Sequence, residues 1–170
     1  PVSRLVVETY LYIMRGVPLL VLLFSIYYIL PYIGIDISSV AGGIIVVALY
    51  FSAFMAEVFR GAILAVPRGQ WDAARALGMY GRKSLLIVVV PQALRLAGPP
   101  YVNTLIMLVK GTSLVSIIGI WELTLAGRQI VERTLAAFQI FGGVALIYFV
   151  ICFGLSCYGR YLEKRVRYVH

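Results

Sequence analysis

The sequence predicts an all-α membrane protein that crosses the bilayer about four times. Of its 170 residues, 62% are apolar and only 13% are charged, whereas soluble domains are nearer half apolar and about a quarter charged. The apolar residues form runs long enough for transmembrane helices, and they lack the alternation of a membrane β-barrel. The length fits a single domain, residues 1–170.

The first span is expected over residues 17–33, and the mixed segment 3–15 is expected to extend the same helix on the cytoplasmic side. The second span, 40–59, is expected to end at Arg60 and Gly61. Its Gly42-Gly43 pair predicts close packing against a neighbouring helix, because small residues let two helices approach each other.

Between the second and third spans lies a more polar stretch, residues 67–91. A short helix is predicted over 70–77, entered at Pro67 and left at Gly78. Its apolar residues Trp71, Ala74 and Leu77 fall on one face at helical spacing. A small amphipathic helix between two membrane spans offers a soluble partner a place to act on the membrane part.

The third span is predicted to be irregular. Residues 84–97 have a helical pattern, the run Gly98-Pro99-Pro100 is expected to break it, and 110–113 interrupts it again before 114–121. Broken backbone at membrane depth is tolerated where it is buried or lines a cavity, which indicates a transport path. A plain proline kink is the alternative interpretation.

Residues 122–134 are interpreted as a polar loop, and 135–158 as the last span, followed by a basic tail, 160–167. In that span Gly142, Gly143, Gly154 and Ser156 are expected to be small packing residues. Basic residues gather on one side of the membrane: Arg4, Arg15, Arg60, Arg68, Arg75, Arg82, Lys83, Arg160, Lys164, Arg165 and Arg167, against Arg128 and Arg133 on the other. The positive-inside rule therefore places the 67–91 loop and the C-terminus in the cytoplasm. The basic residues flank apolar runs instead of forming a soluble patch, so no nucleic acid partner is expected.

The spacing in the polar stretch adds a resemblance. Asp72-Ala73-Ala74, then Gly78, Val88 and Val90-Pro91 resemble the E-A-A-x3-G-x9-I-x-L-P loop of ABC importer permeases, with Asp72, Val88 and Val90 standing for Glu, Ile and Leu. In that family the loop is a coupling helix that docks on a cytoplasmic ATPase. The resemblance assigns this role to Gln70, Trp71, Asp72, Ala73, Ala74, Leu77 and Gly78. An ordinary amphipathic connector is the alternative for the local pattern taken alone.

Further stretches resemble the permeases of polar amino acid importers, the histidine, glutamate/glutamine, arginine and opine type. They are residues 15–20, 52–61, 91–95, 103–106 and 110–114, with Gly111 where that family usually has Asp. The resemblance covers essentially the whole chain. It implies a MetI-like permease fold in the bacterial inner membrane that carries polar amino acids. The family usually has one more helix upstream, and since the chain begins at Pro1 without a signal peptide, that helix is expected to be missing.

No G-x-x-x-x-G-K-[ST] occurs, so ATP and Mg²⁺ are expected on a partner ATPase, and this chain is expected to be no enzyme, with no catalytic residue, cofactor or metal site. The other expected partners are the lipid bilayer, the amino acid substrate and a second permease subunit, identical or a paralogue, since the path lies on a pseudo-two-fold axis. The resemblance adds an external solute-binding protein.

Intramembrane polar residues are the candidates for the substrate path, because burying them is costly. They are Glu57, Asn103, Thr104, Lys110, Thr112 and Ser113. Glu57 either meets a substrate ammonium group or pairs with Arg60, and the pairing is favoured. Asn103 and Thr104 either bind substrate after the expected break or bond between helices, while Thr112 and Ser113 either present a helix N-terminus to a carboxylate or simply cap it. Lys110 either attracts a carboxylate or extends to the membrane interface.

Three other classes compete with the importer. A secondary transporter or channel needs an intramembrane acidic or relay residue, for which Glu57 is a weak candidate. A membrane enzyme needs a catalytic cluster, and the sequence offers no suitable His, Cys or paired carboxylates. A structural or assembly protein leaves the 67–91 pattern unexplained.

Overall fold

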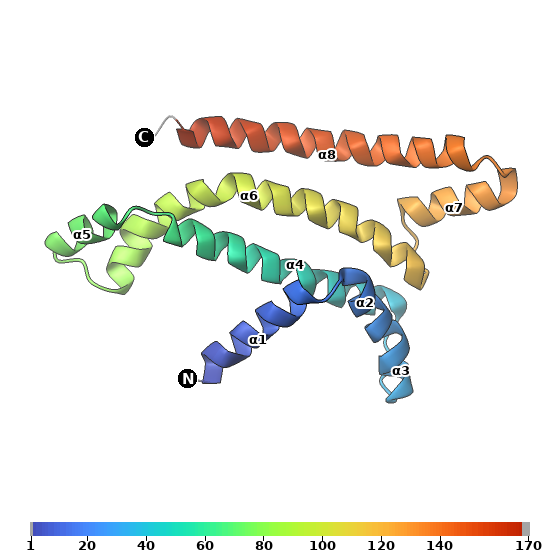
Figure 1. The fold of residues 1–170 in the computed structure, drawn as a ribbon, viewed down its shortest axis with the longest axis horizontal. Coiled ribbons are helices and arrows are strands. Elements are labelled where there is room, and N and C mark those ends of the chain that lie inside the picture. The colour runs from blue at the N-terminus through green and yellow to red at the C-terminus, as the bar shows by residue number, and fades with distance from the viewer. Residues whose placement is uncertain (1, 168–170) are drawn as a thin grey trace.

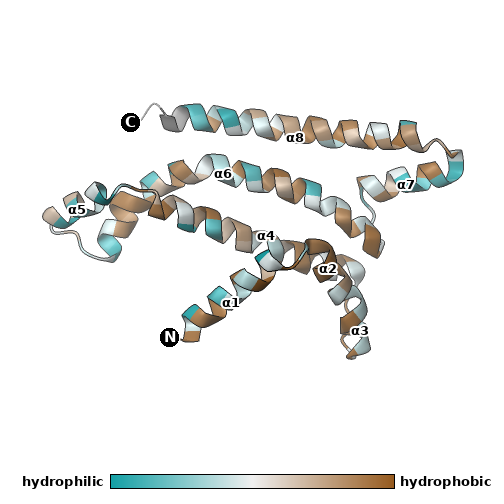
Figure 2. Ribbon diagram, in the orientation of Figure 1, coloured by the Kyte–Doolittle hydropathy of each residue, from teal (hydrophilic) through white to brown (hydrophobic). Residues whose placement is uncertain are grey.

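The computed structural model describes residues 2–167, and this part of the chain is a series of helices joined by short turns. Three long helices lie side by side, with α6 (Val90–Gly111) between α4 (Ser39–Leu64) and α8 (Ala137–Arg167) (Figure 1). In the described part, three helical stretches are long and apolar enough to cross a membrane, or four if the bent N-terminal pair forms one span. This agrees with the predicted four. Figure 2 shows the long helices mostly hydrophobic, with hydrophilic residues on α5, on α7, at the start of α1 and near the C-terminal end of α8.

The first span is bent, contrary to the prediction of one continuous helix. The first helix α1 (Val2–Gly16) and the segment Leu19–Tyr32 meet at 105°. Pro18 has the extended angles φ −59° and ψ 138°, and a proline also disfavours helical backbone at the residue before it. The second half runs from α2 (Leu19–Phe24) through a π-helical turn, η1, into α3 (Leu30–Tyr32).

The second span begins where the Ser38 hydroxyl accepts a hydrogen bond from the Ala41 amide, at 3.2 Å. The helix α4 continues to Leu64, so the prediction that Arg60 and Gly61 end it is wrong. Its last turns are held by burial, because Ala62 joins a buried apolar cluster with the third span. The predicted close packing of the glycine pair against a neighbouring helix is confirmed at Gly42, where a Cβ would lie 2.9 Å from Ile26 Cγ2 in η1.

The third span is helical without interruption from Ser84 to Ile118. It comprises a π-helical segment η2 (Ser84–Val89), then α6, then a 3₁₀ segment η3 (Thr112–Ile118). Pro99 and Pro100 lie inside α6, so the predicted break there is wrong. Each proline removes one backbone donor, but the helix is packed on both sides, against α4 and α8, and Ala97 and Val102 are buried. Tertiary packing holds the helix through the two prolines.

The segment predicted as a polar loop is the helix α7 (Leu123–Thr134). After a turn through Leu135, which has a positive φ of 57°, α8 runs to Arg167 and includes the predicted basic tail. The glycines predicted as packing residues, Gly142, Gly143 and Gly154, meet nothing within 4 Å of an added Cβ in the described residues. Ser156 bonds within its own helix, to the Cys152 carbonyl at 2.8 Å. Gly159 is the α8 glycine that packs closely, with its Cβ position 3.1 Å from Val102.

Candidate functional site: a docking helix and a polar path

The polar stretch between the second and third spans forms the helix α5 (Arg68–Ala76), close to the predicted bounds. Pro67 precedes its first residue, and Gly78 follows its end with φ 73°. The Met79 amide donates to the Ala74 carbonyl at 3.0 Å, and the Gly78 amide donates to Arg75 at 2.9 Å. This is the Schellman closure, which needs a left-handed residue at the glycine position. The turn fixes where the chain leaves the helix.

The inner face of α5 is anchored to the start of the third span. Ala74 is only 2% exposed, and Trp71 packs against an apolar cluster. The buried members of this cluster are Ala62, Val66, Val89, Ala93 and Ala97. The Gln92 amide donates from Nε2 to Gln70 Oε1 at 3.1 Å and to the Val88 carbonyl at 2.9 Å. The helix is therefore joined to two adjacent membrane spans, α4 and η2–α6.

The outer face of α5 is open and charged. Arg68, Asp72 and Arg75, with Trp71, line a hollow of about 490 Å³. Asp72 and Arg75 form an exposed ion pair at 3.3 Å. Leu77 does not share the packed face of Trp71 and Ala74 as the helical spacing predicted, because it lies past the helix end and is 78% exposed. Leu77 is therefore an exposed apolar side chain just past the end of a charged helix.

Glu57 on α4 binds two arginines. Its carboxylate accepts two hydrogen bonds from Arg60, both at 2.8 Å, as the predicted pairing requires. Arg15 on α1 also approaches, with Nη1 3.1 Å from Glu57 Oε2. A second link between the same helices is the Tyr10 hydroxyl, which donates to the Leu49 carbonyl at 2.6 Å. Since α1 has no buried residue, these polar contacts hold it to α4.

Two of the predicted path residues share the open face of α6. Asn103 and Lys110 are both exposed, and seven residues apart on a helix corresponds to about two turns. Neither has a hydrogen bond or ion pair with any described residue. Thr104 is buried and donates to the Pro100 carbonyl at 3.0 Å, so it bonds within its own helix. All of them lie in continuous helix and not after a break.

Thr112 and Ser113 do not begin a new helix, contrary to the prediction. Their hydroxyls donate backwards, to the Val109 carbonyl at 2.7 Å and to the Lys110 carbonyl at 2.7 Å. The backbone passes from α6 into η3 with helical angles, so no free N-terminal amide groups arise here. Gly111 lies between them and Lys110, where a Cβ would come within 2.9 Å of Phe51 Cζ on α4.

A polar cluster that the sequence interpretation missed lies at the start of α7. Glu122 Oε1 accepts from the Leu125 amide at 2.8 Å, and Oε2 accepts from the Thr124 amide at 2.8 Å. The Tyr148 hydroxyl of α8 also donates to Glu122 Oε2, at 2.9 Å. The signal was present in the sequence, because an acidic residue before apolar residues at helical spacing is typical of a helix start.

Several helices long and apolar enough to cross a membrane, with one short amphipathic helix between two of them, define a polytopic membrane protein. Residues 1–168 match the family described as the binding-protein-dependent transport system inner membrane component. The chain belongs to this family. It is therefore a multi-pass permease subunit of the inner membrane and not an enzyme.

Individual relatives are similar in sequence to nearly the whole of this chain. The L-cystine transport system permease protein TcyB of Bacillus subtilis (strain 168) is 40% identical over 98% of this chain and 72% of its own length. The glutamine transport system permease protein GlnP of Escherichia coli (strain K12) is 32% identical over 98% of this chain and 77% of its own. A crystal structure of an amino acid ABC transporter with histidines contains a chain that is 36% identical, with a TM-score of 0.90 over 95% of this chain and 75% of that one.

Proposed function

We propose that this chain is the permease subunit of an ATP-driven importer of polar amino acids, and that α5 is the helix through which a separate ATPase drives it. The observation that carries the proposal is the two-sided character of α5. Its inner face is fixed to two membrane spans by Ala74, Trp71 and the Gln92–Gln70 bond, while its outer face is charged and open. A push on the outer face is therefore transmitted to α4 and α6 together.

We assign different roles to the residues of α5 and of the turn that follows it. Asp72, Ala73 and the exposed Leu77 belong to the docking surface, and Gln70, Trp71 and Ala74 connect it to the spans. Gly78 supplies the left-handed backbone that ends the helix. Closure of two ATPase subunits would move this unit as one body, and the attached spans would shift between outward-facing and inward-facing states.

The substrate path is assigned to the open face of α6. Lys110 offers an unpaired ammonium group for a substrate carboxylate, and Asn103 offers an amide with both a donor and an acceptor. Thr104, Thr112 and Ser113 already donate their hydroxyl protons to carbonyl groups, so they can only accept a hydrogen bond from a substrate ammonium group. Glu57 is occupied by Arg15 and Arg60, and we assign it to joining α1 to α4.

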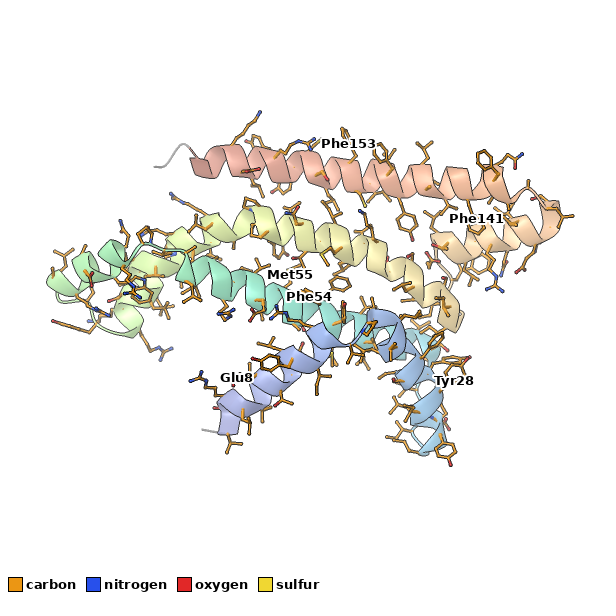
Figure 3. The ribbon with its side chains drawn as sticks, in the orientation of Figure 1. Glu8, Tyr28, Phe54, Met55, Phe141 and Phe153 are labelled. Carbon is orange, nitrogen blue, oxygen red and sulfur yellow. The ribbon has the colours of Figure 1, made fainter. Side chains whose placement is uncertain are left out.

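A complete path needs further chains. An unpaired lysine on an outer face of a transmembrane helix is costly against lipid, so this face of α6 is expected to meet water inside an assembly. Figure 3 shows that α8 also carries exposed side chains, Phe153 among them, that no other described helix covers. A second permease subunit, identical or a paralogue, would enclose the path, and an external solute-binding protein would deliver the amino acid.

The test is co-purification from membranes in mild detergent with mass spectrometry of the bound proteins. We expect a stoichiometric ATPase, and we expect Leu77→Asp to remove it, since a carboxylate replaces an exposed apolar contact at no cost to packing within this chain. Leu135→Asp is the matched control, because Leu135 is 88% exposed and lies in the α7–α8 turn, far along the chain from α5. Purification without any ATPase would overturn the proposal.

A further inference from the structure

The external helix α7 folds back along the first half of α8. Near its middle, a Cβ on Gly127 would lie 2.7 Å from Val144 Cγ2 and 3.7 Å from Ile140 Cγ2. At its start, Glu122 meets Tyr148. The order of these contacts shows that the two helices run antiparallel, as Figure 1 also shows.

The start of α7 lies beside the middle part of α8, and not beside its first turn. From Ala137 to Tyr148, α8 rises by about 16 Å at 1.5 Å per residue, which is about half of the roughly 30 Å hydrocarbon thickness of a bilayer. The candidate span on α8 begins at Ala137. Glu122 therefore lies beside the candidate span about 16 Å from its first residue, and a carboxylate beside a membrane span is expensive unless it is paired.

The Glu122 carboxylate is held by three hydrogen bonds. Two come from the backbone amides of Thr124 and Leu125, in the first turn of its own helix. The third comes from Tyr148, the one partner of Glu122 on another described helix. The Thr124 hydroxyl lies 3.4 Å from the same Tyr148 oxygen and completes a small cluster.

The remaining contact between the two helices is apolar. Gly127 against Val144 gives close packing, but apolar packing has no preferred direction along the helix axis. A hydrogen bond requires donor and acceptor at about 2.9 Å and good alignment. The Tyr148–Glu122 bond therefore adds a directional contact that helps to set the register of α7 on α8, together with the close packing at Gly127 and the short turn at Leu135.

The outer face of α7 is charged and exposed. Arg128 and Glu132 form an ion pair at 3.0 Å, with side chains 64% and 59% exposed. This face carries no part of the packing against α8, so it is available to water and to a partner outside the membrane. A movement of α8 would be transmitted to this face through the hydrogen bond between Tyr148 and Glu122.

We infer that Tyr148 is a positioning residue: its hydrogen bond to Glu122 joins the external helix α7 to the transmembrane helix α8, so that movement of the span is transmitted to the external docking face and back. The inference rests on the proposed function, because it requires an ATPase at one end and a solute-binding protein at the other. It concerns neither the docking helix α5 nor the path residues of α6.

The experiment uses the complete transporter in nanodiscs, with its ATPase, its second permease and its solute-binding protein loaded with substrate. Tyr148→Phe removes one hydroxyl and keeps the ring. We expect basal ATP hydrolysis to stay unchanged, and stimulation by the solute-binding protein to fall by about fivefold, the change expected from losing one hydrogen bond. Hydrogen exchange of the first turn of α7 should rise by a similar factor.

The matched control is Tyr158→Phe on the same helix, since Tyr158 is exposed and has no partner among the described residues. Glu122→Gln keeps one acceptor for Tyr148 and should give an intermediate loss of stimulation. Normal stimulation in Tyr148→Phe would contradict the positioning role of Tyr148, and the importer proposal would remain. A wild-type complex that contains no ATPase would overturn both.

Discussion

Two short amphipathic helices, α5 and α7, lie at opposite ends of the bundle, and each is attached to a longer helix in a different way. Each buries one small residue, Ala74 in α5 and Gly127 in α7, and each makes a side-chain hydrogen bond to a longer helix. No side chain caps the start of α5, and its C-terminal end is closed by the turn at Gly78. In α7 the start is capped by Glu122, which is also bonded to α8.

The difference concerns which end of each helix is fixed. In α5 the last turn is closed at Gly78 while the charged side stays open. In α7 the first turn is bonded to α8, and the last turn leads into α8 through the short turn at Leu135. Under the proposed function, α5 would receive force from the ATPase and α7 would follow the position of α8.

The largest effect is expected from Ala74→Asp. It places a charge where only 2% of the residue is exposed, and an uncompensated buried charge costs about 3–5 kcal/mol. We expect α5 to separate from η2, with increased hydrogen exchange over residues 68–76. Ala76→Asp on the exposed side of the same helix is the control, and equal exchange in both variants would contradict the fixed inner face.

A smaller effect is expected from Gly127→Val in α7. The new side chain would overlap Val144, because the Cβ position is already 2.7 Å from Val144 Cγ2, and overpacking of this kind costs about 1–3 kcal/mol. Thermal unfolding and hydrogen exchange over residues 123–134 would measure it. Gly142→Val on α8 meets open space within the described chain and should leave α7 unchanged. Undisturbed exchange in Gly127→Val would show that α7 is not packed on α8.

A third change separates docking from folding in α5. Gly78→Asp adds a carboxylate at the C-terminal end of the helix, where the helix dipole disfavours negative charge by about 0.3–1 kcal/mol. We expect less substrate uptake for each ATP hydrolysed, with the protein still in the membrane. Gly78→Asn is the control, because asparagine has the same size and tolerates the left-handed backbone. Normal uptake in Gly78→Asp would count against the coupling role of α5.

The smallest effects are expected at the exposed ion pairs of the two helices. Asp72→Asn removes the pair with Arg75, and Glu132→Gln removes the pair with Arg128. Exposed pairs of this spacing contribute about 0.3–0.5 kcal/mol, so neither change should alter exchange of its helix by more than about twofold. A larger change at Glu132 alone would mean that the outer face of α7 is packed against something.

The sequence predicted α5 well because its limits are local signals, a proline before the helix and a glycine after it. The same approach missed α7, because its polar residues resemble a loop when their helical spacing is not considered. It also predicted a break at Pro99 and Pro100, where packing against α4 and α8 overrides the local preference of proline.

For the candidate site, too, the sequence predicted contacts between near neighbours in the chain and missed contacts between distant residues. The residues proposed for docking are neighbours along the chain, so their pattern can be proposed without knowledge of the fold. The pairing of Glu57 with Arg60 is also local and was predicted, but its contact with Arg15 joins residues far apart in sequence. The Tyr148–Glu122 bond also joins residues far apart in sequence, and no rule of sequence spacing predicts it.

The close approach at Gly111 has a consequence for how this sequence can vary. Its Cβ position lies 2.9 Å from Phe51 Cζ and 3.3 Å from Leu19 Cδ2. Any larger residue at position 111 therefore needs a smaller or differently oriented side chain at 51 or 19. Across related permeases these positions should covary, with glycine at 111 accompanying a large aromatic residue at 51.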